Sequence, residues 1–146
     1  METLNKTSLA EQTRKGACLA FFSAYQDMDT ARMIQLATPD ATVHFLPMGE
    51  DGKGTFWEFG RGVWQLLMDC FPDLDNTVDR LTTEGDTITA QVAIFGTQTQ
   101  DFLGITNKGL RFNSDHVFVF QFDGDDRITA LTIDWDHAGF CRQLGS

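Results

Sequence analysis

The chain has 146 residues, of which 42% are hydrophobic and 22% charged, and 21 acidic against 11 basic side chains give it a net charge of -10. This length suits a single domain over residues 1–146 with one core, and the composition excludes a disordered or fibrous protein. The negative charge would repel phosphate backbones and anionic lipids, so we expect no nucleic-acid partner and no membrane partner.

Helices and one strand are predicted in the first half of the chain. Apolar residues recur at helical spacing from residue 8 to residue 26, and again in a shorter stretch that Asp29 or Thr30 begins as an N-cap. Pro72 ends the last helix of this half, because proline disfavours helical geometry at the residue before it. In chain order we expect helix, helix, strand, loop and helix over residues 8–26, 28–37, 41–47, 48–54 and 60–71.

Strands dominate the second half of the chain. Short turns such as the one at Glu84-Gly85-Asp86 suit antiparallel hairpins. We expect four strands and a short final helix over residues 73–85, 86–100, 109–122, 126–135 and 137–144. Helices first and strands afterwards are typical of an α+β fold with an antiparallel sheet.

The strand over residues 109–122 alternates clearly between its two faces. One face is predicted to carry Phe112, Ser114, His116, Phe118, Phe120 and Phe122. His116 is then either a core histidine bonded to a backbone carbonyl, or a pocket histidine that accepts a proton or orients a carboxylate. The same choice, solvent or pocket, stays open for His44 in the earlier strand.

Two aspartates flank Trp135 at the end of the last strand, where alternation puts Trp135 on one face and Asp134 and Asp136 on the other. Asp136 precedes the final helix and Gly145 follows it, which is typical of an N-cap and a C′ residue. A strand end is also where a side chain can face the mouth of a cavity, so both roles are open to Asp136. The three histidines lack the close spacing of metal ligands, so we expect no metal.

The amino-terminal stretch METLNKTSLAEQTRKG is polar, and no apolar run approaches membrane-spanning length. Cys18, Cys70 and Cys141 are widely spaced among apolar neighbours, a pattern typical of buried thiols in a reducing compartment. The sequence therefore predicts a cytoplasmic protein.

Four motifs stand out in the second half of the chain: FPDL after the third predicted helix, GTxTxxFLGI from Gly96 to Ile105, FxF before the Asp-Gly turn, and the closing WDxxGxxRQLG. Together they resemble the SnoaL-like polyketide cyclase family of the nuclear transport factor 2-like superfamily. The resemblance extends from about residue 15 to the end of the chain. It implies a cone-shaped, cystatin-like α+β barrel, in which a curved antiparallel sheet wraps three helices around one deep apolar pocket. It also implies homodimers that pair sheet to sheet.

The resemblance further implies a cyclase of the ester or polyketide type, which closes a ring by an intramolecular aldol reaction without cofactor or metal. Asp136 would be the general acid-base, His116 or His44 its partner, and the ligand a small apolar carbonyl compound. The residues expected to contact this ligand are Trp64, Gln98, Phe112, Phe118, Phe120 and Trp135.

The chain departs from the family at two points. Its cyclases usually carry a histidine on the penultimate strand, where positions 118, 120 and 122 are phenylalanine here, and the family pattern GTHTG reads GTQTQ with Gln98. The fold also hosts epoxide hydrolases, isomerases, dehydratases and non-catalytic binding or dimerisation modules. A hollow without an inward carboxylate would favour binding over catalysis.

Overall fold

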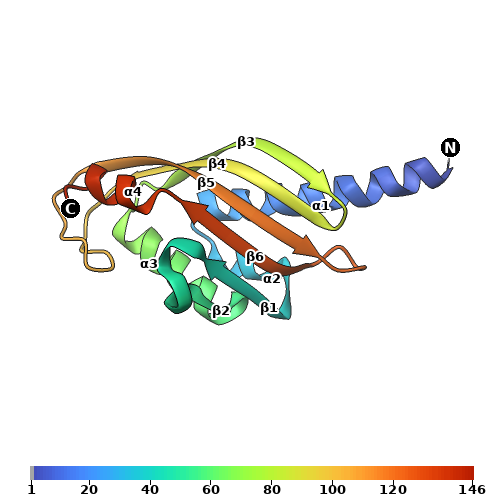
Figure 1. Ribbon diagram of the computed structural model, residues 1–146, viewed down its shortest axis with the longest axis horizontal. Helices are drawn as coiled ribbons and strands as arrows, with labels where there is room; N and C mark the ends of the chain where they lie inside the picture. Colours follow the sequence, from blue (N-terminus) through green and yellow to red (C-terminus); the bar gives the residue numbers. More distant parts are fainter. Residues whose placement is uncertain (1) are drawn as a thin grey trace.

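The structure, a computed structural model, describes residues 2–146, and describes side chains from Leu9 onward. Its elements are α1 (Glu2–Gln26), α2 (Thr30–Gln35), β1 (Ala37–Phe45), the 3-10 helix η1 (Leu46–Gly52), β2 (Lys53–Thr55), the π turn η2 (Phe56–Gly60), α3 (Arg61–Cys70), β3 (Asp75–Glu84), β4 (Thr87–Thr97), β5 (Arg111–Phe122), β6 (Ile128–Trp135) and α4 (His137–Gln143). The predicted α+β class is confirmed, with most elements near their expected positions (Figure 1).

Three predicted boundaries are wrong. β1 spans Ala37–Phe45 rather than residues 41–47. α1 begins at Glu2 rather than at residue 8, in keeping with the absence of glycine and proline before Gly16, which leaves nothing in the sequence to end the helix earlier. The stretch predicted as a loop, 48–54, contains part of η1 and the short strand β2, which pairs with β1. Gly54 fits there because a Cβ atom would lie 2.5 Å from the Cβ atom of Phe59.

All six strands belong to one curved sheet in the order β2-β1-β6-β5-β4-β3. Neighbouring strands are antiparallel except β1 and β6, which run parallel, with Val43 opposite Leu131. Hairpin turns predict pairing between successive strands only, so this contact between the first and last long strands is not visible in the turn pattern. It brings the end of β1 beside the end of β6.

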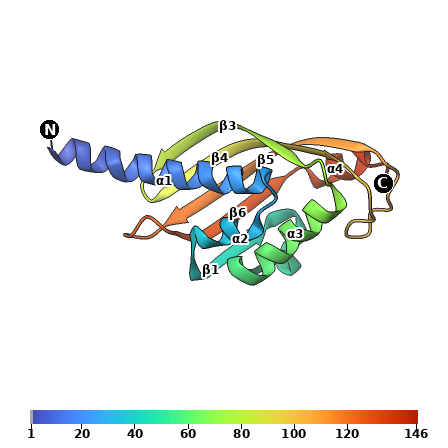
Figure 2. The same cartoon turned by 180° about the vertical axis from the view of Figure 1, so that it is seen from behind.

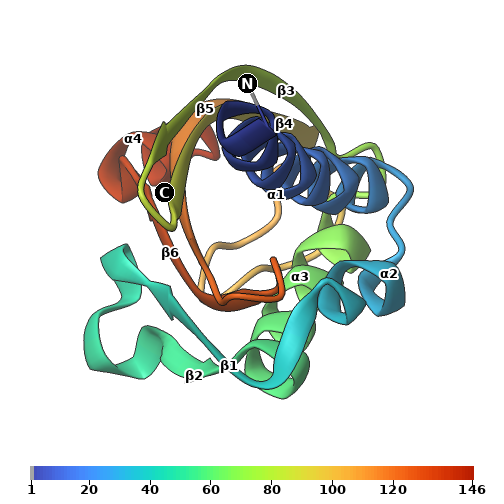
Figure 3. The same ribbon diagram turned by 90° about the vertical axis from the view of Figure 1, so that its right-hand side faces the viewer.

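α1, α2 and α3 lie together on the concave face of the sheet (Figures 2 and 3). Phe21 and Phe22 of α1 meet the phenylalanines of β5 edge to face, with ring centroids 5.4 Å apart for Phe21 and Phe120 and 4.9 Å apart for Phe22 and Phe118. The predicted alternation of β5 is confirmed: its phenylalanines are buried, whereas Val117 on the other face is 40% exposed. The core therefore forms between α1 and this strand.

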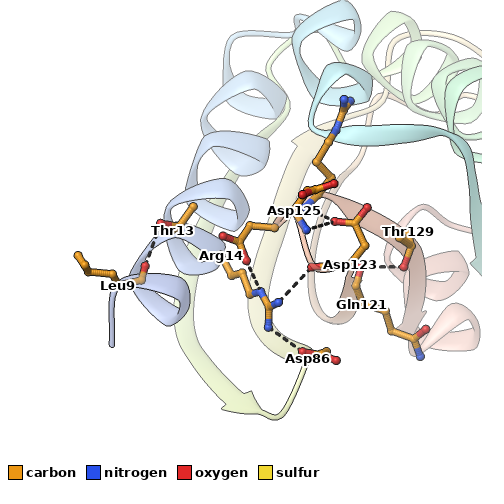
Figure 4. Close-up of polar contacts among 10 residues, drawn as sticks. Leu9, Thr13, Arg14, Asp86, Gln121, Asp123, Asp125 and Thr129 are labelled. Carbon is orange, nitrogen blue, oxygen red and sulfur yellow. Dashed lines mark hydrogen bonds and ion pairs between the residues drawn. The ribbon is translucent and has the colours of Figure 1, made fainter. Parts of the chain in front are cut away.

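A polar cluster, which we call the Arg14 clamp, ties α1 to two hairpin turns at one end of the barrel. The Arg14 guanidinium lies 2.9 Å from a carboxylate oxygen of Asp86 and 2.8 Å from one of Asp126, and it donates to the carbonyl oxygen of Asp123 at 3.1 Å (Figure 4). It also lies over the ring of Phe122, 5.8 Å from the centroid. The turns after β3 and β5 are thus closed onto the helix.

The opposite end of the barrel is formed by α4 and the β4–β5 loop, residues 98–110 (Figure 1). Within this loop Phe102 and Ile105 exchange two backbone hydrogen bonds, of 3.0 and 2.8 Å. Leu103 and Gly104 between them both have positive φ, 45° and 82°, as a tight hairpin turn requires. Within the described part of the chain, no helix is both long enough and apolar enough to span a membrane.

Candidate functional site

An apolar cavity opens between α4, the β4–β5 loop and η1, and reaches into the barrel as far as α1 and α3. Room for water-sized molecules inside it amounts to about 60 Å³, and the free space including the open mouth is about 590 Å³. Aromatic walls come from four elements and the loop: Phe45, Trp64, Phe102, Phe112, Phe118 and Phe140. A narrow, aromatic cleft of this kind suits a flat or slender uncharged molecule.

Four of the expected contact residues, Trp64, Phe112, Phe118 and Trp135, come together in the lining of this cavity. Phe120 does not: it is fully buried behind the wall, against Phe21. Alternation along β5 was sufficient to place these phenylalanines inside, but not to say which of them reach free space.

Gln98 also lies behind the wall, 1% exposed. Its side-chain amide nitrogen donates to the carbonyl oxygens of Gln100 and Ile105, at 3.0 and 2.9 Å, so the side chain holds the β4–β5 loop in shape. That loop carries Phe102 and Leu103 into the cavity mouth. The expectation that Gln98 contacts a ligand is therefore not met, because its donors serve the loop.

Asp136 lies outside the cavity. Its carboxylate accepts a hydrogen bond from the backbone N–H of Gly139 at 3.0 Å, and the side chain is 73% exposed, 4.0 Å from Arg142. The predicted N-cap is confirmed. The carboxylate borders a separate, polar hollow on the outside with Asn113 and Asp115. It does not face the apolar cavity, because Trp135 occupies the inner face and the next residue points away from it.

His116 lines the cavity, in agreement with the interpretation of this residue as a pocket histidine. Its Nδ1 lies 3.0 Å from the carbonyl oxygen of Ser114, so Nδ1 carries the proton and Nε2 is left as an acceptor. The imidazole stacks on Trp135, with centroids 5.4 Å apart and 19° between the planes. Burial among apolar groups lowers the pKa of His116 to about 4, so the ring is neutral at pH 7.

His44 does not reach the cavity. Its Nε2 lies 3.2 Å from the carbonyl oxygen of Gly49, and the residue borders a shallow surface groove between β1 and β2 with Lys53. The histidine choice that the sequence left open is thereby resolved for both residues: His116 is the pocket histidine, and His44 is not.

Two lining residues with polar groups were missed by the sequence reasoning. His137 lies at the cavity mouth, where its Nδ1 accepts a hydrogen bond from Trp135 Nε1 at 3.2 Å and its Nε2 lies 3.5 Å from the sulfur of Cys141. Tyr25, the only tyrosine of the chain, reaches the cavity from α1 and is 2% exposed. The one sequence signal for Tyr25 is its helical spacing from the other apolar residues on the inner face of α1.

Neither a carboxylate nor a metal cluster belongs to the cavity as far as the described side chains show. The described lining residues include no Asp or Glu. Among the described residues, no three side chains of the metal-binding types come close enough together to hold an ion. The polar chemistry of the cavity therefore rests on His116, Tyr25, His137 and the tryptophans.

The model of the SnoaL-like domain matches residues 19–131. IdmH, a proposed polyketide cyclase from Streptomyces antibioticus, is 24% identical, over 91% of this chain and 99% of that chain, with a TM-score of 0.78. A proposed SnoaL-like polyketide cyclase from Jannaschia sp. CCS1 is 19% identical over 92% and 93%, with a TM-score of 0.81. AclR, a proposed hydroxylase from Streptomyces galilaeus, is 21% identical over 90% and 95%, with a TM-score of 0.78. No functionally curated protein matches the chain.

Proposed function

This chain belongs to the SnoaL-like family of the nuclear transport factor 2-like superfamily, and from that premise we propose that it is a cyclase-type enzyme acting on a small apolar carbonyl compound. One observation carries the proposal: His116, whose Nε2 is unprotonated, lines a cavity with mostly apolar walls. The similarity to IdmH and to the Jannaschia protein, both proposed polyketide cyclases, points to the same reaction class.

The proposed reaction uses His116 as its acid-base group in place of Asp136. Nε2 of His116 takes a proton from the carbon beside a ligand carbonyl, and the electron pair of that C–H bond moves to the carbonyl oxygen. The enolate carbon then attacks a second carbonyl of the same molecule, and the resulting alkoxide recovers the proton from Nε2. A neighbouring enolate stabilises the imidazolium and so raises its pKa during the reaction. Positioned proton transfer of this kind contributes about 100- to 10,000-fold.

The walls supply the rest of the proposed catalysis. Aromatic side chains such as Phe112 and Phe118 exclude water and hold a flexible chain in the folded conformation that ring closure needs. The backbone hydrogen bond from Nδ1 to Ser114 fixes the ring of His116, so Nε2 keeps its direction. No cofactor enters this scheme.

Proton abstraction is testable without the natural substrate. Indan-2-one is a flat, uncharged ketone whose methylene protons exchange slowly with deuterium oxide, and exchange is followed by proton NMR. We expect the protein to accelerate the exchange and His116→Gln to lower the acceleration at least about 100-fold, since the amide keeps an acceptor but is no base. Asp136→Asn is the matched control and should exchange at the wild-type rate; a large loss in that variant, or none in His116→Gln, would refute the assignment.

A non-catalytic binding module is the second candidate, and the lack of Asp and Glu among the described lining residues favours it. Under this alternative the cavity holds the same class of ligand without reaction. Saturable binding of indan-2-one, combined with exchange no faster than in buffer, would decide for the binding module. His116 would then serve as the hydrogen-bond acceptor of a bound hydroxyl group.

We also propose that two copies pair through the outer face of the sheet. Val117, 40% exposed at the centre of β5, lies between Gln91 of β4 and Asp134 of β6, and the half-buried Val119 follows it on the same face. A two-fold dimer would pair this face with the same face of the second copy. Sedimentation should give a dimer for the wild type and a monomer for Val117→Asp, whereas a monomeric wild type would exclude the pairing.

A further inference from the structure

Two residues that line the cavity carry hydrogen-bond donors that the proposed reaction does not use. The Tyr25 hydroxyl comes from α1 and the Trp64 indole N–H from α3; both residues line the cavity, and they are 2% and 1% exposed. Neither donor has a hydrogen-bond partner among the described residues. Neither atom belongs to the described polar atoms that are both sealed from water and without a partner, so both keep contact with free space, where a ligand atom can reach them.

Two other ring N–H donors of the cavity lining are already paired. Trp135 Nε1 donates to His137, and His116 Nδ1 is bonded to the backbone of Ser114. The indole of Trp57, outside the cavity, is also satisfied, since its Nε1 donates to the carbonyl oxygen of Ala37 at 3.1 Å. Among the described residues, the unpaired indole of Trp64 is therefore unusual even within this chain.

The two donors are held firmly. Tyr25 and Trp64 belong to different helices, and each packs edge-on against Phe21, at 6.1 and 5.3 Å between ring centroids. The other end of the Trp64 ring is fixed against Gly60, where a Cβ atom would lie 3.1 Å from it. Fixed donors in an apolar space cost no reorganisation when an acceptor arrives. Burial raises the pKa of the Tyr25 hydroxyl, so it stays protonated and remains a donor.

We propose that Tyr25 and Trp64 are the hydrogen-bond donors for two separate oxygen atoms of the ligand, and that the cavity selects uncharged apolar compounds with two carbonyl groups. The inference rests on the proposed function, since an intramolecular aldol reaction needs two carbonyls in one molecule. Each donor would hold one oxygen, while His116 Nε2 remains free for the proton between them. A hydrocarbon of the same shape would leave both donors unpaired.

Three compounds with one skeleton test this selection: pentylbenzene, valerophenone and 1-phenylpentane-1,4-dione, with no, one and two carbonyl groups. Binding to the whole protein is measured by calorimetry or competition. We expect Tyr25→Phe to lower affinity for the dione about tenfold and to leave affinity for pentylbenzene within about twofold. The unchanged hydrocarbon affinity reports that the cavity of the variant is intact.

Trp64 is followed without disturbing the core. In nitrogen-15-labelled protein the three tryptophans give three indole N–H resonances, which single tryptophan variants assign. The Trp64 resonance should move downfield on addition of the dione and not on addition of pentylbenzene, whereas the Trp57 resonance should not move. Equal shifts with both compounds, or none with the dione, would overturn the role of Trp64.

The outcomes separate this inference from the proposed function. If pentylbenzene binds and Tyr25→Phe affects all three compounds equally, the donors are not ligand contacts, although the apolar cavity stands. If the dione needs both donors but His116→Gln changes no exchange rate, the dicarbonyl selection stands and the catalytic role of His116 falls. If none of the three compounds binds to the wild type, both proposals fail.

Discussion

The two ends of the barrel are built from opposite kinds of interaction. At one end the Arg14 clamp satisfies its charges with Asp86, Asp126 and a backbone carbonyl, and closes two hairpin turns onto α1. At the other end apolar side chains surround free space, and donors and an acceptor are left without partners. Groups that are fully paired within the protein serve its stability, whereas unpaired groups fixed around a space are available to a ligand. A ligand is therefore expected at the open end.

The largest effect is expected at Phe21, which lies between the two ends. Its ring is fully buried and contacts Tyr25, Trp64, Phe118 and Phe120. Phe21→Ala should lower the free energy of unfolding by about 3–5 kcal/mol, because it leaves a cavity in the core. Urea denaturation gives the value, with Leu19→Ala, at a 50% exposed position of the same helix, as the control. A small loss at Phe21 would mean that the two ends fold independently of this ring.

The free energy of unfolding should depend on pH through His116, which lies at the open end. Its pKa is 6.5 when exposed and about 4 in the fold, so the unfolded chain binds more protons between these values. The wild type should therefore hold its full stability above pH 6.5 and lose about 2 to 3 kcal/mol of it as the pH falls towards 4. Carboxylates titrate in the same range, so the difference from His116→Gln isolates the histidine. A difference that does not change with pH would place His116 in water rather than in the cavity wall.

At the closed end, Arg14→Met keeps an apolar stem over Phe122 and removes the charge. We expect a loss of about 1–2 kcal/mol, since the guanidinium is mostly buried but Asp86 is 76% exposed and so screened by water. Lys15→Met, which removes one partly exposed ion pair with Glu11 on the same helix, is the matched control. Ligand affinity at the other end should not change in either variant. If Arg14→Met weakened ligand binding, the two ends would not be as separate as their contacts indicate.

Much of this contrast was predictable from sequence, and the missing part has a physical reason. Period-two alternation along β5 and β6 correctly placed His116, Phe118 and Trp135 on the inner face. The family motif favoured Asp136 as a pocket carboxylate, whereas alternation placed it on the outer face. The outer position is the one observed, since the Asp136 side chain is 73% exposed.

What alternation could not supply is the outline of the free space. The backbone bond of His116, the loop held by Gln98 and the unpaired hydroxyl of Tyr25 all depend on contacts between segments far apart in the chain. Helical spacing puts Tyr25 on the inner face of α1 but gives no sign that its hydroxyl lacks a partner. Such properties emerge only when the sheet has closed around the helices.

The smallest effect is expected at Asp136. This residue lies near the open end, but its carboxylate is paired with a backbone N–H, so we expect it to contribute to stability and not to the reaction. Asp136→Ala removes the acceptor for the Gly139 N–H and should cost about 1 kcal/mol of stability, whereas Asp136→Asn and Asp136→Ser should retain most of it, because all three polar side chains cap helices well. Thermal denaturation measures the difference. In all three variants the rate of indan-2-one exchange should equal that of the wild type, because the exposed carboxylate does not line the cavity. A variant that folds with wild-type stability but exchanges slowly would move the catalytic group from His116 back to the end of β6.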